Sequence, residues 1–241
     1  MTRDTSTATL TNGRELMQLH VETLFTHDAA GDLVRVNEPS GAPAPRFFFG
    51  STVDGSVLRF RYDVDLELRR ELERAAEAEV RQSRGVDSPA DAARYEEILA
   101  RAAPARSTWA GPAFSFPGEL PAVTGPVLVT EANAELLRLH LQAWVPDVPL
   151  GQPMVALPVD GRAVAICGSV RRSGRAHEAG VETASPYRGR GYAAQVVAAW
   201  ARAVRDTGRI PLYSTSWRNE ASRAVARKLA LIQFGSDLHI T

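Results

Sequence analysis

The stretch Tyr187-Arg188-Gly189-Arg190-Gly191-Tyr192-Ala193 is a basic, glycine-rich turn between two regular patterns. A strand-like run from Glu178 to Ala184 precedes it, and a helix-like run from Ala193 to Arg205 follows it at once. Such a turn aims several backbone N–H groups and the positive end of the helix dipole at one point. Its glycines allow a bulky anion to approach the backbone. The stretch therefore predicts a site for a phosphate or pyrophosphate.

The turn differs from the two best-known phosphate-binding motifs. The sequence contains no Gly-x-x-x-x-Gly-Lys-Ser/Thr run, and the turn does not match the Gly-x-Gly-x-x-Gly fingerprint of dinucleotide-binding proteins. A basic glycine turn can also be a plain connector with solvated arginines. A ligand site is favoured here by the order of the elements, which is strand, turn, helix, strand and a helix that begins at an asparagine.

The composition sets limits on the class of protein. The 241 residues suffice for one large or two modest domains, and 28 Lys and Arg residues balance 28 Asp and Glu residues. This neutral charge argues against a protein that coats nucleic acid. The single cysteine, Cys167, excludes an internal disulfide and fits a cytoplasmic location. No apolar run is long enough to span a membrane, and the five scattered histidines predict no metal site.

The N-terminal half predicts a mixed region of its own. Residues 1–12 are polar and are expected to form a disordered tail. Hydrophobic periodicity and the hairpin signal Asp54-Gly55 predict a helix at 13–25, strands at 33–36, 46–50 and 56–62, and helices at 64–81 and 89–101. Residues 104–121 are rich in proline, glycine and aromatic residues, and we expect a packed connector there.

The C-terminal half has a different order of elements. Its patterns predict a helix at 132–144 and strands at 127–129, 154–159, 162–170 and 178–184, with a second hairpin at Asp160-Gly161. A helix at 193–205, a strand at 210–216, a helix at 219–229 and a last strand at 232–240 follow. Val196, Trp200 and Val204 recur at helical spacing, so we expect them in the core.

A second landmark follows the turn, the segment Asn219-Glu220-Ala221-Ser222-Arg223-Ala224-Val225-Ala226-Arg227-Lys228-Leu229. Together with the turn and the order of elements around it, this segment resembles the GNAT superfamily of acyl-CoA-dependent N-acetyltransferases. The resemblance covers about residues 120–241. It implies an α/β (α+β mixed) fold with a mixed, mostly antiparallel sheet flanked by helices. We expect an N-terminal α+β region of unknown role at 1–118 and a GNAT-like acetyltransferase domain at 119–241.

The resemblance also implies that acetyl-CoA is the cofactor. In this family two neighbouring strands separate and hold the pantetheine arm between them, and here those strands are 178–184 and 210–216. Backbone groups of the first strand would pair with the arm, and the turn would hold the pyrophosphate. The residues expected to bind the cofactor are Val181, Thr183, Arg188, Gly189, Arg190, Gly191, Tyr192, Ala193, Asn219 and Ser222. Asn219 and Ser222 could equally form only a helix cap.

Family members usually transfer the acetyl group by direct attack of an amine, with a glutamate on the fourth strand as the base. Glu178 and Glu182 lie four residues apart and therefore on one face of a regular strand, unless a bulge intervenes. We expect Glu182 to be the base, with Glu178 as the close alternative and His177 as a third, at the exposed start of the strand. Either glutamate could instead only pair with an arginine. Cys167 is expected in the core.

The sequence departs from the family pattern at the proton donor. The tyrosine that usually protonates the departing thiolate is replaced by Ala226, which leaves Tyr192, Tyr213 or water for this role. The chain also ends at Thr241, with little room for the seventh strand of many members. That strand could come from elsewhere in the chain.

Three hypotheses on function follow. We favour an acetyl-CoA-dependent N-acetyltransferase that acts by direct attack of a primary amine of a small molecule, a peptide or a protein. A non-catalytic acyl-CoA-binding or sensing module is the alternative, and a structural protein whose N-terminal half binds a partner is the third. We expect no nucleic-acid or membrane partner, and a homodimer stays open. The N-terminal half is expected to form one wall of the acceptor site.

Overall fold

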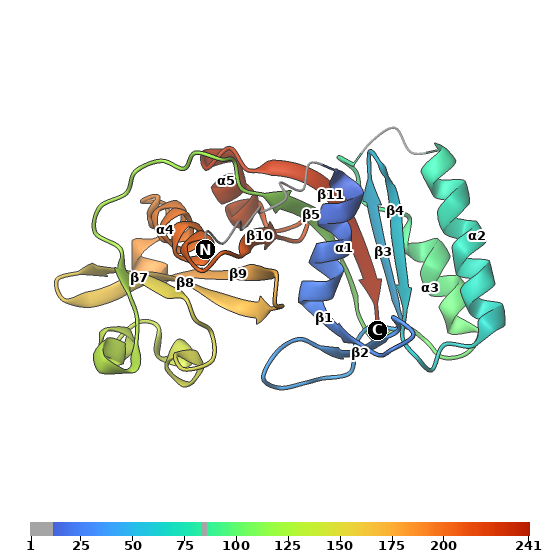
Figure 1. Cartoon of the computed structure of the whole chain (residues 1–241), viewed down its shortest axis with the longest axis horizontal. Helices are drawn as coiled ribbons and strands as arrows, with labels where there is room; N and C mark the ends of the chain where they lie inside the picture. The colour runs from blue at the N-terminus through green and yellow to red at the C-terminus, as the bar shows by residue number, and fades with distance from the viewer. Residues whose placement is uncertain (1–11, 83–85) are drawn as a thin grey trace, which may run out of the picture.

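One long sheet organises the computed structural model, which describes residues 12–82 and 86–241 (Figure 1). The predicted tail, residues 1–12, lies outside the described residues except for Asn12. The helices are α1 (Gly13–Leu24), α2 (Leu66–Gln82), α3 (Ala92–Ala100), α4 (Tyr192–Asp206) and α5 (Glu220–Lys228). The strands are β1 (Phe25–His27), β2 (Leu33–Val36), β3 (Phe47–Thr52), β4 (Gly55–Phe60), β5 (Thr108–Ser115), β6 (Val127–Leu128), β7 (Met154–Val159), β8 (Arg162–Arg172), β9 (Ala176–Thr183), β10 (Ile210–Ser214) and β11 (Ile232–Ile240).

The main sheet has nine strands in the order β4-β3-β11-β5-β10-β9-β8-β7-β6, and β1 and β2 form a separate small sheet. Strands β9 and β10 are parallel, whereas the other pairings in the described part of the main sheet are antiparallel. This mixed, mostly antiparallel sheet flanked by helices confirms the predicted fold class. Both hairpins, at Asp54-Gly55 and Asp160-Gly161, also form where they were predicted.

Strand β5 corrects the prediction of a connector at residues 104–121. It is inserted between β10 and β11 and is antiparallel to both. Phe114 of β5 and Phe116, which follows the strand, are buried, as expected, because they pack against the core under α4. A strand from the first half of the chain therefore fills the place between the last two strands of the second half. The seventh strand that the sequence left open comes from this segment.

Helices cover both faces of the sheet (Figure 1). On one face, α1 packs its buried side chains Leu16 and Leu19 against Phe48, Ala113 and Leu212. On the other face, α4 and α5 cover β8, β9 and β10, and α2 and α3 cover the end formed by β3 and β11. Neighbouring residues of one strand point to opposite faces, so Ala113 meets α1 whereas Phe114 meets the α4 side. The sheet thus separates an α1 side from an α4 side.

The predicted helix at 132–144 is wrong. Two short 3₁₀ helices, η1 (Glu131–Leu137) and η2 (Gln142–Asp147), occupy this stretch and cover the α1 side of β7 and β8. Asn133 has a non-helical φ of −130°, and Pro146 lies inside η2. Proline removes a backbone donor and clashes with a continuing α-helix, which accounts for the short segments. The segment η2 places the Trp144 ring over Gly168 of β8 and Gly180 of β9.

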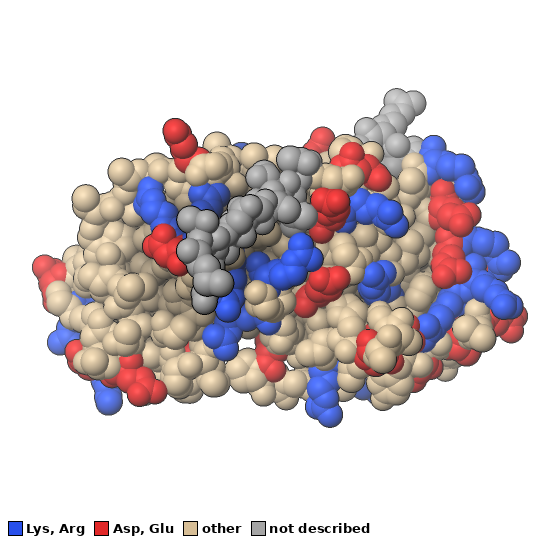
Figure 2. Space-filling model, in the orientation of Figure 1, with Lys and Arg blue, Asp and Glu red and all other residues tan. Residues whose placement is uncertain are grey.

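The two predicted parts share this one sheet, because β3 pairs with β11 and β5 pairs with β10 and β11 of the C-terminal half, while β4 joins the sheet through β3. The boundary at residue 118 stays a prediction. None of the described helices combines the length and the apolar character that a membrane crossing requires. Figure 2 shows basic and acidic side chains interspersed over the end of the molecule that carries α2.

Candidate active site

The site begins where β9 and β10 separate. These parallel strands pair at only three positions, the last of which joins Glu178 to Leu212. Beyond it β9 continues to Thr183 and stays paired with β8, whereas β10 continues to Ser214 and stays paired with β5 along its other edge. The edge of β9 that faces β10 therefore carries unpaired backbone groups after Glu178. The two strands separate where the sequence analysis expected, and we call this place the fork.

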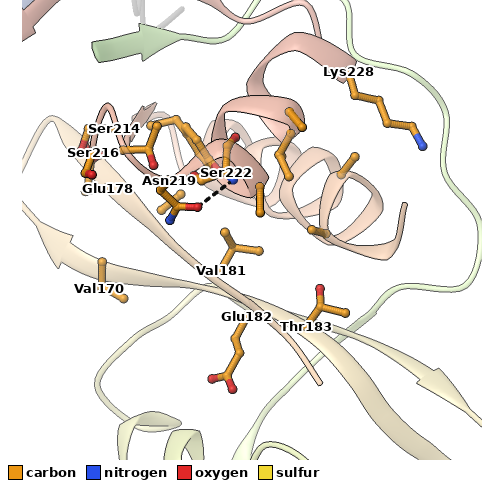
Figure 3. A pocket seen from close by; sticks show the side chains of 18 of the residues that line it. Val170, Glu178, Val181, Glu182, Thr183, Ser214, Ser216, Asn219, Ser222 and Lys228 are labelled. Carbon is orange, nitrogen blue, oxygen red and sulfur yellow. Dashed lines mark hydrogen bonds between the residues drawn. The ribbon is translucent and has the colours of Figure 1, made fainter. Parts of the chain in front are cut away.

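A cavity of about 950 Å³ extends along the fork. In Figure 3, Val181 of β9 faces Ser222 of α5 and Asn219, the N-cap of that helix. The expected cofactor residues line this cavity with the exception of Arg190. Side chains of α1, β5, β8 and β11 line it as well, namely Leu24, Trp109, Val170, Arg171 and His239. The cavity thus reaches from the α4 side of the sheet through the fork to the α1 side.

The glycine turn closes one end of the cavity. Gly189 and Gly191 have positive φ angles of 77° and 80°, a left-handed conformation that other residues adopt only with strain. Gly191 is the N-cap of α4 and no side chain caps the helix, so the first N–H groups are available to a ligand. The ammonium group of Lys228 lies beside Gly191, where a Cβ would collide with it.

Lys228 is a cation at this turn that the sequence analysis missed as a ligand contact. It is the last residue of α5, is exposed, and lines the cavity. Its place in the second motif was visible in the sequence. Its approach to the turn was not, because the approach depends on how α5 packs beside α4.

The two arginines of the turn bind the protein backbone. Arg188 donates from Nε to the Thr183 carbonyl at 3.1 Å, and Arg190 donates to the Pro186 carbonyl at 3.2 Å. The Arg190 guanidinium also lies over the Tyr187 ring, 5.2 Å from its centre. Both side chains therefore hold the turn in shape. Contacts from these guanidinium groups to a phosphate stay a prediction.

At the start of α5, Asn219 is a helix cap that also lines the cavity. Its Oδ1 accepts a hydrogen bond from the Ser222 backbone N–H at 3.0 Å (Figure 3). The Ser222 hydroxyl is 2.6 Å from the Tyr213 hydroxyl. Burial raises the pKa of Tyr213 to about 12, although its hydrogen bond with Ser222 acts in the opposite direction. This phenol stays protonated near neutral pH.

Thr183 offers a second polar group to the cavity. Its hydroxyl is buried and finds no hydrogen-bond partner among the described residues. Buried polar groups normally have a partner, so an orphaned hydroxyl beside an unpaired strand edge indicates a place for a ligand with polar groups.

Glu178 and Glu182 lie on the same face of β9, as the sequence predicted. The register shift in this pair of strands lies between Ser169 and Arg171 of β8, so β9 keeps its alternation. The environments of the two glutamates differ. Glu178 is 3% exposed at the fork, whereas Glu182 is exposed and its carboxylate accepts a hydrogen bond from the Trp144 indole at 2.6 Å. Figure 3 shows Glu182 directed away from Val181, Asn219 and Ser222.

The Glu178 carboxylate has a buried partner from the N-terminal half. It lies 3.3 Å from Nδ1 of His20 in α1, and Nε2 of the same ring lies 3.5 Å from Asp237 in β11. Burial alone would lower the pKa of His20, but the two carboxylates outweigh it and raise the pKa to about 10. Burial also raises the pKa of Asp237. The sequence analysis missed His20 and Asp237.

The α1 side of the cavity has an aromatic wall. The rings of Trp109 and His239 are stacked with their centres 4.8 Å apart, and Leu24 lies on the same cavity. Arg171 lines it too and forms an ion pair with Glu38. Burial lowers the pKa of His239 to about 3, with a contribution from the positive charge of Arg171. Residues of the first half of the chain thus line this end of the cavity.

The structure corrects the expectation for His177 and confirms the one for Cys167. His177 is buried, not exposed, and its Nδ1 lies 2.9 Å from the Ser169 hydroxyl, which also accepts from the Trp200 indole. Burial lowers the pKa of His177 to about 4, helped by two arginines, and the residue does not line the cavity at the fork. Cys167 is fully buried in the core, and burial raises the pKa of its thiol.

Part of the second half of the chain is similar to a known protein family. A protein-family model described as GNAT acetyltransferase matches residues 155–234, a range that contains β9, the glycine turn, α4, β10 and α5. This match confirms the resemblance that the sequence motifs predicted. A comparison with curated proteins gives no match.

Among the solved structures that this chain resembles are several described as acetyltransferases. A putative one from Novosphingobium aromaticivorans is 21% identical, with a TM-score of 0.48, over 56% of this chain and 65% of that chain. One from Colwellia psychrerythraea is 10% identical, with a TM-score of 0.48, over 76% and 75% of the two chains. A putative acetyltransferase from Salmonella typhimurium, solved with acetyl-CoA, is 15% identical, with a TM-score of 0.35, over 48% and 90%. At these identities and TM-scores, the similarity to the GNAT acetyltransferase family rests on the match at residues 155–234.

Proposed function

We propose that this protein is an acetyl-CoA-dependent N-acetyltransferase that transfers an acetyl group to a primary amine of a small molecule or peptide by direct attack. One observation carries the proposal: an unpaired strand edge leads from an anion-binding turn to a buried carboxylate, all along one cavity. The match to the GNAT acetyltransferase family supports the reaction class.

The residues along the cavity suit each part of acetyl-CoA. The N–H groups at the start of α4, with Lys228 beside them, suit the pyrophosphate. The free edge of β9 near Val181 and the orphaned Thr183 hydroxyl suit the amides of the pantetheine arm. When bound, acetyl-CoA supplies a thioester whose carbonyl carbon an amine can attack. An arm running along β9 from the turn would bring that end to the fork.

Glu178 is the better-placed base of the two glutamates. A general base must come within hydrogen-bond reach of the proton that it removes, and Glu178 lies in the fork while Glu182 is held by Trp144 at the surface. The acceptor amine would enter from the α1 side, along Trp109 and His239, and lose its proton to Glu178. This assignment reverses the order of preference in the sequence analysis.

On the α4 side, the hydrogen-bonded hydroxyls of Tyr213 and Ser222 are the donors that we propose for the departing sulfur. The usual tyrosine position holds Ala226, which is 2% exposed in the core under α4 and has no side-chain group that could donate a proton. A hydroxyl donor and a carboxylate base would then lie on opposite sides of the fork.

Thermal unfolding with and without acetyl-CoA, followed by thiol release with a panel of amines, tests the proposal. A ligand at about 100 times its Kd stabilises a protein by roughly 2.7 kcal/mol. Stabilisation together with amine-dependent thiol release is the expected result. Stabilisation without release on any amine would favour the acyl-CoA-binding module, and no stabilisation would contradict both.

A further inference from the structure

A buried cluster of three charged side chains lies next to the fork. Glu178 of β9 and Asp237 of β11 are each 3% exposed, and His20 of α1 lies between them at 0%. The imidazole is 3.3 Å from the first carboxylate and 3.5 Å from the second. The side-chain nitrogen and oxygen atoms of Glu178 and His20, and both carboxylate oxygens of Asp237, find no hydrogen-bond partner elsewhere among the described residues. Each of the three side chains therefore has the other members of the cluster as its polar neighbours.

The charges of this cluster do not balance. Two carboxylates share one imidazolium, so the fully ionised cluster carries a net charge of −1 in a buried place, which is costly. The neighbouring groups change this little. Arg171 is paired with Glu38, and the altered pKa values of Tyr213 and His239 keep both neutral near pH 7. The cluster can take up one proton, and Glu178 is its member that lines the cavity.

The cluster has no geometry for a metal ion. Among residues 12–82 and 86–241, no group of three or more His, Cys, Asp or Glu side chains is placed to hold one. A proton can instead neutralise the surplus negative charge. An acceptor amine could deliver this proton, because Glu178 lines the cavity.

We propose that His20 and Asp237 are positioning residues for Glu178, and that α1 thereby makes the N-terminal half part of the catalytic centre. This inference rests on the proposed N-acetyltransferase function. His20 holds the Glu178 carboxylate at the fork and stabilises its ionised form. Asp237 offsets the positive charge of His20, so that Glu178 remains basic enough to remove a proton from the acceptor. Each carboxylate therefore has a different task.

The proton balance of the reaction fits this arrangement. The ammonium group of the acceptor passes one proton to Glu178, which brings the cluster from −1 to zero, and the electron pair stays on nitrogen. The N–C bond then forms while the C–S bond breaks, and that electron pair leaves with sulfur. Nitrogen gives up its second proton, and the departing sulfur takes one. The proton on Glu178 returns to solvent, so one proton is released for each amide formed.

Opposite pH shifts test the inference. The full chain and the variants His20→Gln and Asp237→Asn are assayed for thiol release between pH 5 and 10, with the best acceptor from spermidine, tyramine, glucosamine and a short peptide with a free amino terminus. His20→Gln leaves two carboxylates without their cation, so we expect the acidic limb of the profile to move up by about one pH unit or more. Asp237→Asn leaves Glu178 with an uncompensated cation, so the limb should move down and the maximal rate should fall about tenfold.

The control is Met17→Leu, a volume-conserving change in the buried side of the same helix that leaves the charges in place. It should keep the wild-type profile even if it lowers the melting temperature. Profiles of His20→Gln and Asp237→Asn that lose rate but do not shift, as a purely structural role predicts, would overturn the inference.

An NMR titration of the His20 ring provides a readout that needs no turnover. In the wild type the ring should stay protonated up to about pH 10, and in Glu178→Gln it should lose its proton at a lower pH. A wild-type ring that titrates near its ordinary value of about 6.5 would also overturn the inference. Absence of thiol release from the wild type with every amine would instead contradict the proposed function.

Discussion

The two ends of the cavity are built in different ways. At the turn, the residues that line the cavity are consecutive residues of β9, the turn 187–193 and α4, with α5 close behind. At the fork, the lining residues come from α1, β5, β8, β9 and β11, which lie far apart in the sequence. The first end depends on local backbone geometry, and the second on the assembly of the whole sheet. A substitution at the turn should therefore change one binding step, whereas a substitution at the fork should change the chemistry.

The two ends of the cavity also draw on different halves of the chain. The turn end lies within the range that matches the GNAT acetyltransferase family, residues 155–234. The α1 side of the fork adds Leu24 and Trp109 from outside that range, with His20 behind them. If the proposed function holds, the turn end would bind acetyl-CoA in the way that the family match suggests, whereas the acceptor side would be built largely from residues outside the matched range.

The largest effect is expected at the fork. Glu178→Gln keeps the shape of the side chain and removes the proposed base, and loss of a general base typically lowers a rate by about 10²- to 10⁴-fold. We expect a fall of that order in kcat/KM, measured by thiol release, with acetyl-CoA affinity unchanged. The Asp237–His20 pair remains in this variant, so the melting temperature should change little. A variant that retains more than a third of the wild-type rate would remove Glu178 from the mechanism.

The next effect is expected at the turn. Gly191→Asp places a side chain on a residue with a φ of 80° and next to Lys228, and it adds a negative charge where the pyrophosphate should lie. We expect the affinity for acetyl-CoA, measured by calorimetry, to fall about 10- to 100-fold.

Gly208→Asp is the matched control for this change. Gly208 has a similar φ of 75°, nothing lies within 4 Å of its Cβ position, and it does not line the cavity. The left-handed conformation should therefore destabilise both variants to a similar extent, by about 1–2 kcal/mol. Equal affinity for acetyl-CoA in both variants would mean that the turn holds no pyrophosphate.

A smaller effect is expected from Lys228→Met, which removes the cation beside the turn. The ammonium group is exposed, so its contribution is screened, and we expect acetyl-CoA affinity to fall about three- to tenfold at low salt and less at high salt. Arg227→Met is the control, because Arg227 is also exposed on α5 but does not line the cavity. An equal loss in both variants would indicate a general effect of surface charge.

The same contrast explains what the sequence could predict. Glycines at 189 and 191, the Asn219 cap and the Asp-Gly hairpins act through neighbouring residues, so their patterns predicted the turn end and most of the elements correctly. The parity of Glu178 and Glu182 also followed from strand geometry alone.

Strand β5 and the cluster at the fork could not be predicted in this way. Residues 108–115 contain Gly111 and Pro112, which are poor strand formers, and they become a strand because β10 and β11 offer edges on both sides. His20 lies in an amphipathic helix, where nothing local distinguishes a core histidine from one that meets Glu178. The sequence analysis preferred Glu182 because it could not reveal which glutamate would be buried at the fork and which would meet Trp144.

The smallest effect is expected for Glu182→Gln, and this makes it the sharpest test of that choice. Glu182 and Glu178 lie on the same face of β9, so the two substitutions make the same chemical change at two places, one exposed and one buried. The Trp144 indole can still donate its hydrogen bond to the amide oxygen of glutamine, and the side chain is exposed, so neither stability nor rate should depend on its charge. We expect kcat/KM to change by less than about threefold. A large loss here, together with an active Glu178→Gln variant, would transfer the base to Glu182 and place the acceptor nearer to Trp144. In that case the chemistry would lie closer to the turn, and the N-terminal half would have no part in it.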